Sequence, residues 1–165
     1  MAAEAAVGAP APARLINPWH LVWALAAIAV MIAAILSASL WALNFVHALA
    51  GLMWTGIDLF MGFVVGPILR RLDPPARRAF TLALMPRMIF LMPTLAIVTG
   101  TAGWYLAQQI GYLDVGYPQR AWVVAALVII AILTVQGLGI LLPTNLRVCL
   151  ELRKESPDFA RIGAW

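Results

Sequence analysis

Four long apolar stretches, separated by short charged or polar segments, dominate the sequence. Asp58 is the only formal charge within residues 15–69, and Asp114 and Arg120 are the only ones within residues 88–146. A membrane-spanning helix needs roughly 20 apolar residues, so each of these two intervals has room for two spans. The pattern predicts helices over about residues 19–36, 40–69, 84–107 and 121–142.

The spans are expected to be helices because lipid offers no hydrogen-bond partners to the backbone. No alternating pattern of apolar and polar residues suggests strands. Prolines lie near the ends of three spans, at Pro67, Pro86 and Pro143, and the fourth helix is expected to stop before Pro143. Pro93 is expected to kink the third helix. The sequence therefore predicts an all-α integral membrane protein, a four-transmembrane-helix bundle.

The distribution of basic residues predicts how the bundle is oriented. Residues 70–87, between span two and the start of span three, have five arginines against the single acid Asp73, and the tail after span four has four bases against three acids. The two other connections are nearly neutral, since residues 37–39 have no charge and Asp114 is balanced by Arg120. Because basic loops remain in the cytoplasm, both termini are expected to be cytoplasmic.

Two flanking segments complete the predicted organisation. Residues 1–18 are rich in Ala and Pro and are expected to form a flexible cytoplasmic leader, before a membrane domain over residues 19–143. A cleaved signal peptide is the alternative, because Ser37-Ala38-Ser39 resembles a small-residue cleavage site. Residues 144–165 are expected to form an amphipathic cytoplasmic tail.

The composition supports the membrane assignment. Apolar residues make up 64% of the 165 residues and charged residues 11%, against roughly 25% charged in soluble domains. These values exclude a soluble enzyme and a disordered regulator, and the single cysteine, Cys149, excludes a disulfide scaffold. The net charge of +4 arises from bases that border apolar runs, so it indicates topology rather than binding to nucleic acid.

Polar residues within the second span are the first candidates for a functional site. His47, Gly51, Trp54, Asp58 and Gly62 share one face of a helix at 100° per residue. This face is either a packing seam with two hydrogen-bonded polar groups, or the lining of a pocket for a flat cofactor beside the glycines.

Arg87 and three methionines open the third span. Arg87 has three interpretations: it extends to the lipid headgroups, it pairs with Asp58, or it holds an anionic cofactor group. Met85, Met88 and Met92 share one helix face, where thioethers either bind Cu(I) or fill gaps in apolar packing.

The second span also contains a motif that resembles a group of bacterial helical membrane proteins. The motif is HALAGLMWTG at residues 47–56, followed by Gly66-Pro67 and Arg70-Arg71. The group includes the copper-resistance protein D family, the membrane-bound protoporphyrinogen oxidase family and the membrane domains of urate-oxidising proteins that deliver electrons to a cytochrome c. The resemblance covers about residues 40–108. It implies a membrane bundle in which His47 matches the histidine that binds heme b, or a metal, in relatives.

One departure limits what the resemblance implies. The oxidase branch also relies on an intramembrane lysine, whereas the only lysine of this chain is Lys154, in the tail. The resemblance therefore does not extend to the oxidase activity.

Our leading hypothesis is an integral membrane subunit of a redox or respiratory-type assembly in the bacterial cytoplasmic (inner) membrane. It would bind heme b for electron transfer, with His47 as axial ligand, Gly51, Trp54 and Asp58 as pocket lining, and Arg87 on a propionate. Its partners would be lipid, other membrane or redox subunits, or further copies of the chain, and not nucleic acid.

Two alternatives remain, namely copper transport through His47, Met85, Met88 and Met92, and a structural subunit without a cofactor. Catalysis by the chain alone ranks last, since no acid–base pair or nucleophile is recognisable.

Overall fold

The computed structural model describes residues 17–114, 116–154 and 156–164, and these residues form helices without any strand. The elements are α1 (Pro18–Leu36), α2 (Leu40–Phe60), the π-helical η1 (Met61–Val65), α3 (Gly66–Arg71), α4 (Pro74–Ile110), α5 (Arg120–Thr134), the π-helical η2 (Val135–Leu141), α6 (Leu142–Leu152) and α7 (Phe159–Ala164).

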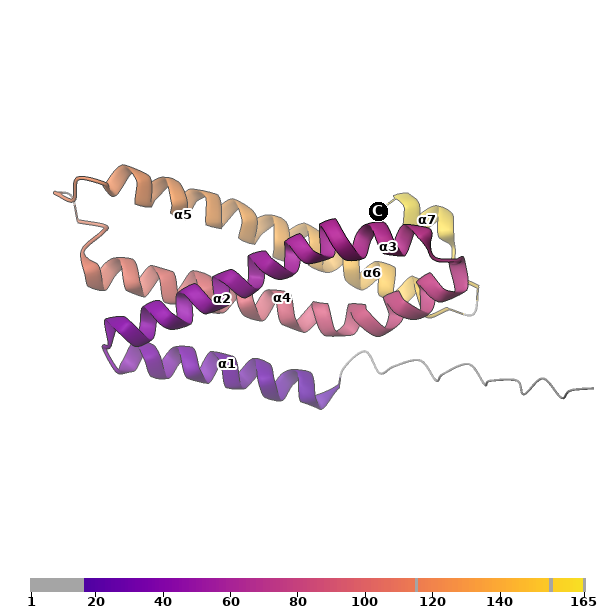
Figure 1. Ribbon diagram of the computed structural model, residues 1–165, viewed down its shortest axis with the longest axis horizontal. Helices are drawn as coiled ribbons and strands as arrows, with labels where there is room; N and C mark the ends of the chain where they lie inside the picture. The colour runs from indigo at the N-terminus through magenta and orange to yellow at the C-terminus, as the bar shows by residue number, and fades with distance from the viewer. Residues whose placement is uncertain (1–16, 115, 155, 165) are drawn as a thin grey trace, which may run out of the picture.

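Several of these elements join end to end into four helical rods that are long and apolar enough to cross a membrane. The rods are Pro18–Leu36, Leu40–Arg71, Pro74–Ile110 and Arg120–Leu152 (Figure 1). The chain is thus an all-α four-helix membrane bundle, as predicted. Of the predicted leader, residues 1–16 lie outside the described residues.

The two ends of the bundle differ in charge. The turn between α1 and α2 and the connection between α4 and α5 lie at one end, which we call the neutral end (Figure 1). The turn between α3 and α4, the start of α1, and α6 and α7 lie at the other end, the basic end (Figure 1). Most of the basic residues of the chain lie at the basic end, because they flank α3, α4 and α6.

Local capping explains why α4 begins well before the predicted boundary near residue 84. The Asp73 side chain accepts a hydrogen bond from the amide of Ala76 at 3.4 Å, and Pro74 and Pro75 occupy the first helical positions, where proline is well tolerated. The helix ends at Gly111, whose φ of 80° suits glycine. The third helix therefore projects beyond its apolar part at the basic end.

The prediction that the fourth helix ends before Pro143 is wrong, because the chain remains helical to Leu152. A π-helical turn precedes Pro143, and another precedes Pro67. In these turns the amides of Gly66 and Leu142 donate to carbonyls five residues back rather than four. The wider turn admits the proline ring, which would otherwise clash with the carbonyl four residues earlier.

The third helix likewise continues through its prolines. Pro86 and Pro93 both lie inside α4, which is unbroken from Pro74 to Ile110. Pro86, placed near a span end by the sequence pattern, is therefore an interior residue of the helix, because α4 starts at Pro74.

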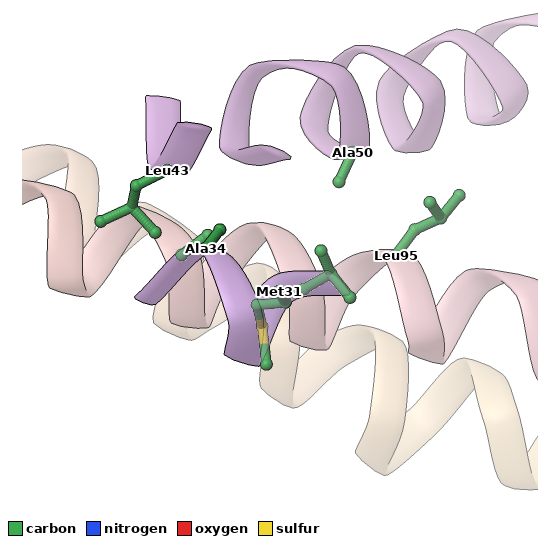
Figure 2. Packing of buried hydrophobic residues seen from close by; sticks show 7 residues of the cluster. Met31, Ala34, Leu43, Ala50 and Leu95 are labelled. Carbon is green, nitrogen blue, oxygen red and sulfur yellow. The ribbon is translucent and has the colours of Figure 1, made fainter. Parts of the chain in front are cut away.

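The packed core lies where α1, α2 and α4 meet. Its buried residues are Met31, Ala34, Leu43, Ala50, Leu95, Val98 and Ala102. Figure 2 shows Met31 and Ala34 of α1, Leu43 and Ala50 of α2 and Leu95 of α4 gathered at this junction. Cleavage after Ser39 would remove Met31 and Ala34 from this core.

The fourth rod packs differently. None of the residues of α5 is buried, and α5 reaches the rest of the bundle mainly through η2 and α6, which packs on α4. Figure 1 shows α5 standing away from α2 and α4 toward the neutral end. This arrangement leaves a groove between the fourth rod and the other helices.

The tail is fastened to the start of α4 by one arginine. The Arg78 guanidinium donates to the carbonyl oxygens of Leu152 at 2.9 Å and Lys154 at 2.7 Å. These carbonyls lie at the C-terminal end of α6, where a cation is favoured by the helix dipole. The basic end therefore holds the fourth rod against α4, although α5 stands away from it.

The topology predicts which positions share a side of the membrane. With Cys149 replaced by alanine, we expect an impermeant maleimide to label Ser37→Cys and Gln119→Cys in intact cells. Pro75→Cys and Ser156→Cys should be labelled only after lysis, because positive loops stay in the cytoplasm. If the two members of either pair were labelled from opposite sides of the membrane, the four-rod topology would be wrong. If both pairs were labelled from the sides opposite to those expected, the orientation would be wrong.

Candidate functional site

A cavity of about 780 Å³ lies between α2 and α4 on one side and α5, η2 and α6 on the other. Its lining on α4 extends from Met88 to Ala107, roughly 30 Å at the helical rise per residue. The cavity is thus an elongated groove with mainly apolar walls. Its volume falls within the range of about 300–1,000 Å³ that is usual for ligand pockets.

His47 crosses from α2 to α4 at the neutral half of this groove. Its Nδ1 lies 2.9 Å from the carbonyl oxygen of Thr99. A carbonyl only accepts hydrogen bonds, so Nδ1 carries the hydrogen and donates it. In the neutral form of such a ring the lone pair is on Nε2, which has no hydrogen-bond partner among the described residues. His47 lines the cavity, so Nε2 can accept a hydrogen bond from a ligand or bind a metal there.

Gly103 makes this placement of the imidazole possible. A Cβ atom at Gly103 would lie 2.6 Å from Cε1 and 2.7 Å from Nδ1 of His47. Gly51 plays a lesser part, since a Cβ there would lie 3.3 Å from Cγ2 of Thr99. Small residues at close helix contacts are common in membranes, and here they admit a ring rather than only a neighbouring helix.

Thr99 has a second polar group beside His47. Its side chain is buried, and Oγ1 has no hydrogen-bond partner in the part of the chain that the structure describes. The hydroxyl groups of Thr94 and Thr134, by contrast, donate to the carbonyls one turn earlier at 2.7 and 2.8 Å. A buried hydroxyl without a partner is costly and is one mark of a functional position.

The structure brings together most of the residues that the sequence analysis singled out. Those that line the cavity are His47, Gly51, Trp54 and Asp58 of α2, and Met88 and Met92 of α4. Met85 and Arg87 are not among the lining residues. Met85 and Arg87 therefore do not lie in the cavity that His47 lines, although their predicted roles would place them at the same site.

Arg87 makes a local contact instead. Its guanidinium donates to the carbonyl of Ala83 on the same helix, and its side chain is exposed. Of the three interpretations of Arg87, pairing with Asp58 is not realised, because the two side chains form no ion pair.

Met88 and Met92 lie at a different depth in the membrane from the His47 imidazole. Met92 precedes Thr99 by seven residues and Met88 by eleven, about 10 and 16 Å along α4. The described residues contain no group of three His, Cys, Asp or Glu side chains that would hold a metal ion. The lining therefore offers one imidazole, with the two thioethers well separated from it.

Sequence reasoning did not single out Thr99 and Gly103. Both belong to the run Thr99-Gly100-Thr101-Ala102-Gly103, a stretch of five small residues in the third span. Such a run indicates a close approach of another helix and was the available signal. The partner of that approach was visible only in the structure.

Comparisons with family models, curated proteins and solved structures find no match for this chain.

The fit of His47 against Gly103 predicts a stability difference between two neighbouring glycines. Gly103→Ala should lower the free energy of unfolding by about 1–3 kcal/mol, since the methyl group overlaps the imidazole. Gly100→Ala, one turn earlier, should be neutral or stabilising by up to about 1 kcal/mol, because a Cβ there meets no atom within 4 Å. Denaturant or thermal unfolding in micelles measures both.

A double variant checks the cause. If the methyl group overlaps the imidazole, Gly103→Ala should lower the free energy of unfolding much less in a His47→Ala background than in the unaltered protein. Equal losses in the presence and absence of the imidazole would show that the contact is not the reason.

Proposed function

We propose that this chain is an integral membrane subunit of a redox assembly, and that it binds heme b through Nε2 of His47. The observation that carries the proposal is the hydrogen bond from Nδ1 to the Thr99 carbonyl. Histidines that ligate metals usually donate their other ring nitrogen to a carbonyl or carboxylate, which fixes the tautomer and aims the ligand. His47 has this arrangement at the wall of a large apolar cavity.

The lining residues fit a flat apolar ring. Besides Gly51 and Gly103, the lining includes Gly100 and Gly137, where a Cβ atom would meet nothing within 4 Å. The indoles of Trp54 and Trp104 add broad apolar surfaces. Small backbone-lined walls together with a few polar groups are typical of cofactor pockets.

His47 would be the one residue of the described chain that holds the iron. His20 lies in the first turn of α1 at the basic end, where its ring contacts that of Phe90 at a centroid distance of 5.5 Å. Met92 lies two helical turns from Thr99 and so is not placed opposite the imidazole. Any further group that holds the iron would thus come from another subunit.

The acidic groups of heme would need donors other than arginine. No arginine or lysine lines the cavity. Trp104 and Tyr112, which line it toward the neutral end, carry the indole N–H and phenol O–H groups suited to this role. Arg87, which the sequence suggested for a propionate, lies outside the lining.

His47 and Thr99 would then have defined tasks. When bound, heme b supplies a one-electron redox centre within the membrane. His47 would hold the iron, Thr99 would orient the imidazole, and the surrounding apolar side chains would exclude water. The chain would carry electrons to or from other redox subunits of a bacterial inner membrane, with its basic end in the cytoplasm.

A visible spectrum of the purified full-length protein tests the proposal. With heme available during expression, the reduced-minus-oxidised spectrum should show heme bands, and His47→Ala should retain at least tenfold less heme. His20→Ala is the matched control and should bind as the unaltered protein does, because His20 lies at the other end of the bundle. A colourless protein, or equal heme content in His47→Ala, would refute this function.

A further inference from the structure

A second polar region lies in the same groove, away from His47. Asp58 and Thr55 of α2 line it together with Thr134 of α5 and Gln136 of η2. Counted from the neutral ends of their helices, Asp58 lies about 27 Å deep and Gln136 about 24 Å deep. These positions are near the middle of rods that are 32 and 33 residues long. The four polar residues therefore line the groove at similar depths, near the middle of the membrane.

Asp58 is the only acidic residue of this lining. The other titratable groups of the lining are His47 and Tyr112, both toward the neutral end. The basic residues on the elements around it include Arg87 of α4, Arg70 of α3 and Arg147 of α6, and none of these three forms an ion pair with Asp58. An ionised carboxylate at this depth in a membrane is energetically unfavourable without a counter-charge.

We propose that Asp58, with Thr55, Thr134 and Gln136 beside it, forms a proton-binding site at the centre of the membrane. A single proton neutralises the carboxyl group completely. A divalent metal ion would keep a net positive charge there and would need six or more oxygen ligands. The four side chains offer five oxygen atoms in all, on two separate helical rods, so the proton fits this site better.

The groove also provides a route for the proton. Its lining continues from the level of Asp58 past Met88 and Leu142 to Asn145, on the helix that reaches the basic end. Pro67 and Pro143, which lack an amide hydrogen, lie beside this part of the bundle, each after a π-helical turn. Such turns leave backbone carbonyls free to accept hydrogen bonds from water, and π-helical turns are frequent at functional sites. We therefore assign the basic end as the side from which Asp58 exchanges its proton.

Infrared spectroscopy of the full-length protein in lipid bilayers tests the site. A protonated carboxyl group absorbs apart from ionised ones, so the unaltered protein at pH 7 should show this band at an intensity of one group per chain. Asp58→Asn should remove the band, and Asp58→Glu should retain it at a shifted frequency. Asp114→Asn, in the connection at the neutral end, is the matched control and should leave it unchanged.

Two outcomes would overturn the proposal. Absence of the band from the unaltered protein would show that the carboxylate is ionised, as expected if a cation or a basic residue of a partner chain neutralised it. Persistence of the band in a folded Asp58→Asn variant would assign the proton to another acid. The measurement needs no bound cofactor, so its failure leaves the heme proposal standing, and the reverse also holds.

Discussion

The hydrogen bond between His47 and the Thr99 carbonyl is the interaction on which the site depends. It links α2 to α4 and places the hydrogen of the imidazole on Nδ1 within the apolar part of the bundle. In lipid the imidazole has no water to serve this purpose, so the hydrogen must find an acceptor within the protein. The Thr99 carbonyl serves because Gly103, one turn further along α4, leaves space for the ring. The hydrogen bond thus leaves Nε2 free at the cavity wall and adds a polar contact to the apolar packing between the two helices.

The fourth rod, which packs loosely against the other helices, forms the other wall of the groove. The helices α1, α2 and α4 form the compact part of the bundle, whereas α5 contributes no buried residue and is held at the basic end through α6. A bundle with four evenly packed helices would leave no groove of this length. The groove instead joins two polar regions, one around His47 and one around Asp58, within one apolar wall. The groove thus has tightly packed helices on one side and a loosely packed helix on the other.

The sequence predicted the fold and part of the site for identifiable reasons. Charge-free runs of span length predict helices in lipid directly, and the 100° periodicity placed His47, Gly51, Trp54 and Asp58 on one face, where all four line the cavity. The limits of the helices were less predictable, since Asp73 caps α4 early and a π-helical turn carries the chain through Pro143. Thr99 and Gly103 were not predicted, because the periodicity of one helix does not reveal which residues of a neighbouring helix it contacts. Arg87 was assigned to the site only because of its expected depth in the membrane, whereas its guanidinium contacts its own helix.

Nitrogen NMR of the histidines tests the central contact most directly. The chain has two histidines, so a His20→Gln variant labelled with ¹⁵N-histidine reports on His47 alone. We expect hydrogen on Nδ1 and a bare Nε2 in the cofactor-free protein. Hydrogen on Nε2 with a bare Nδ1 would mean that the imidazole does not donate to the Thr99 carbonyl, and this result would contradict the account.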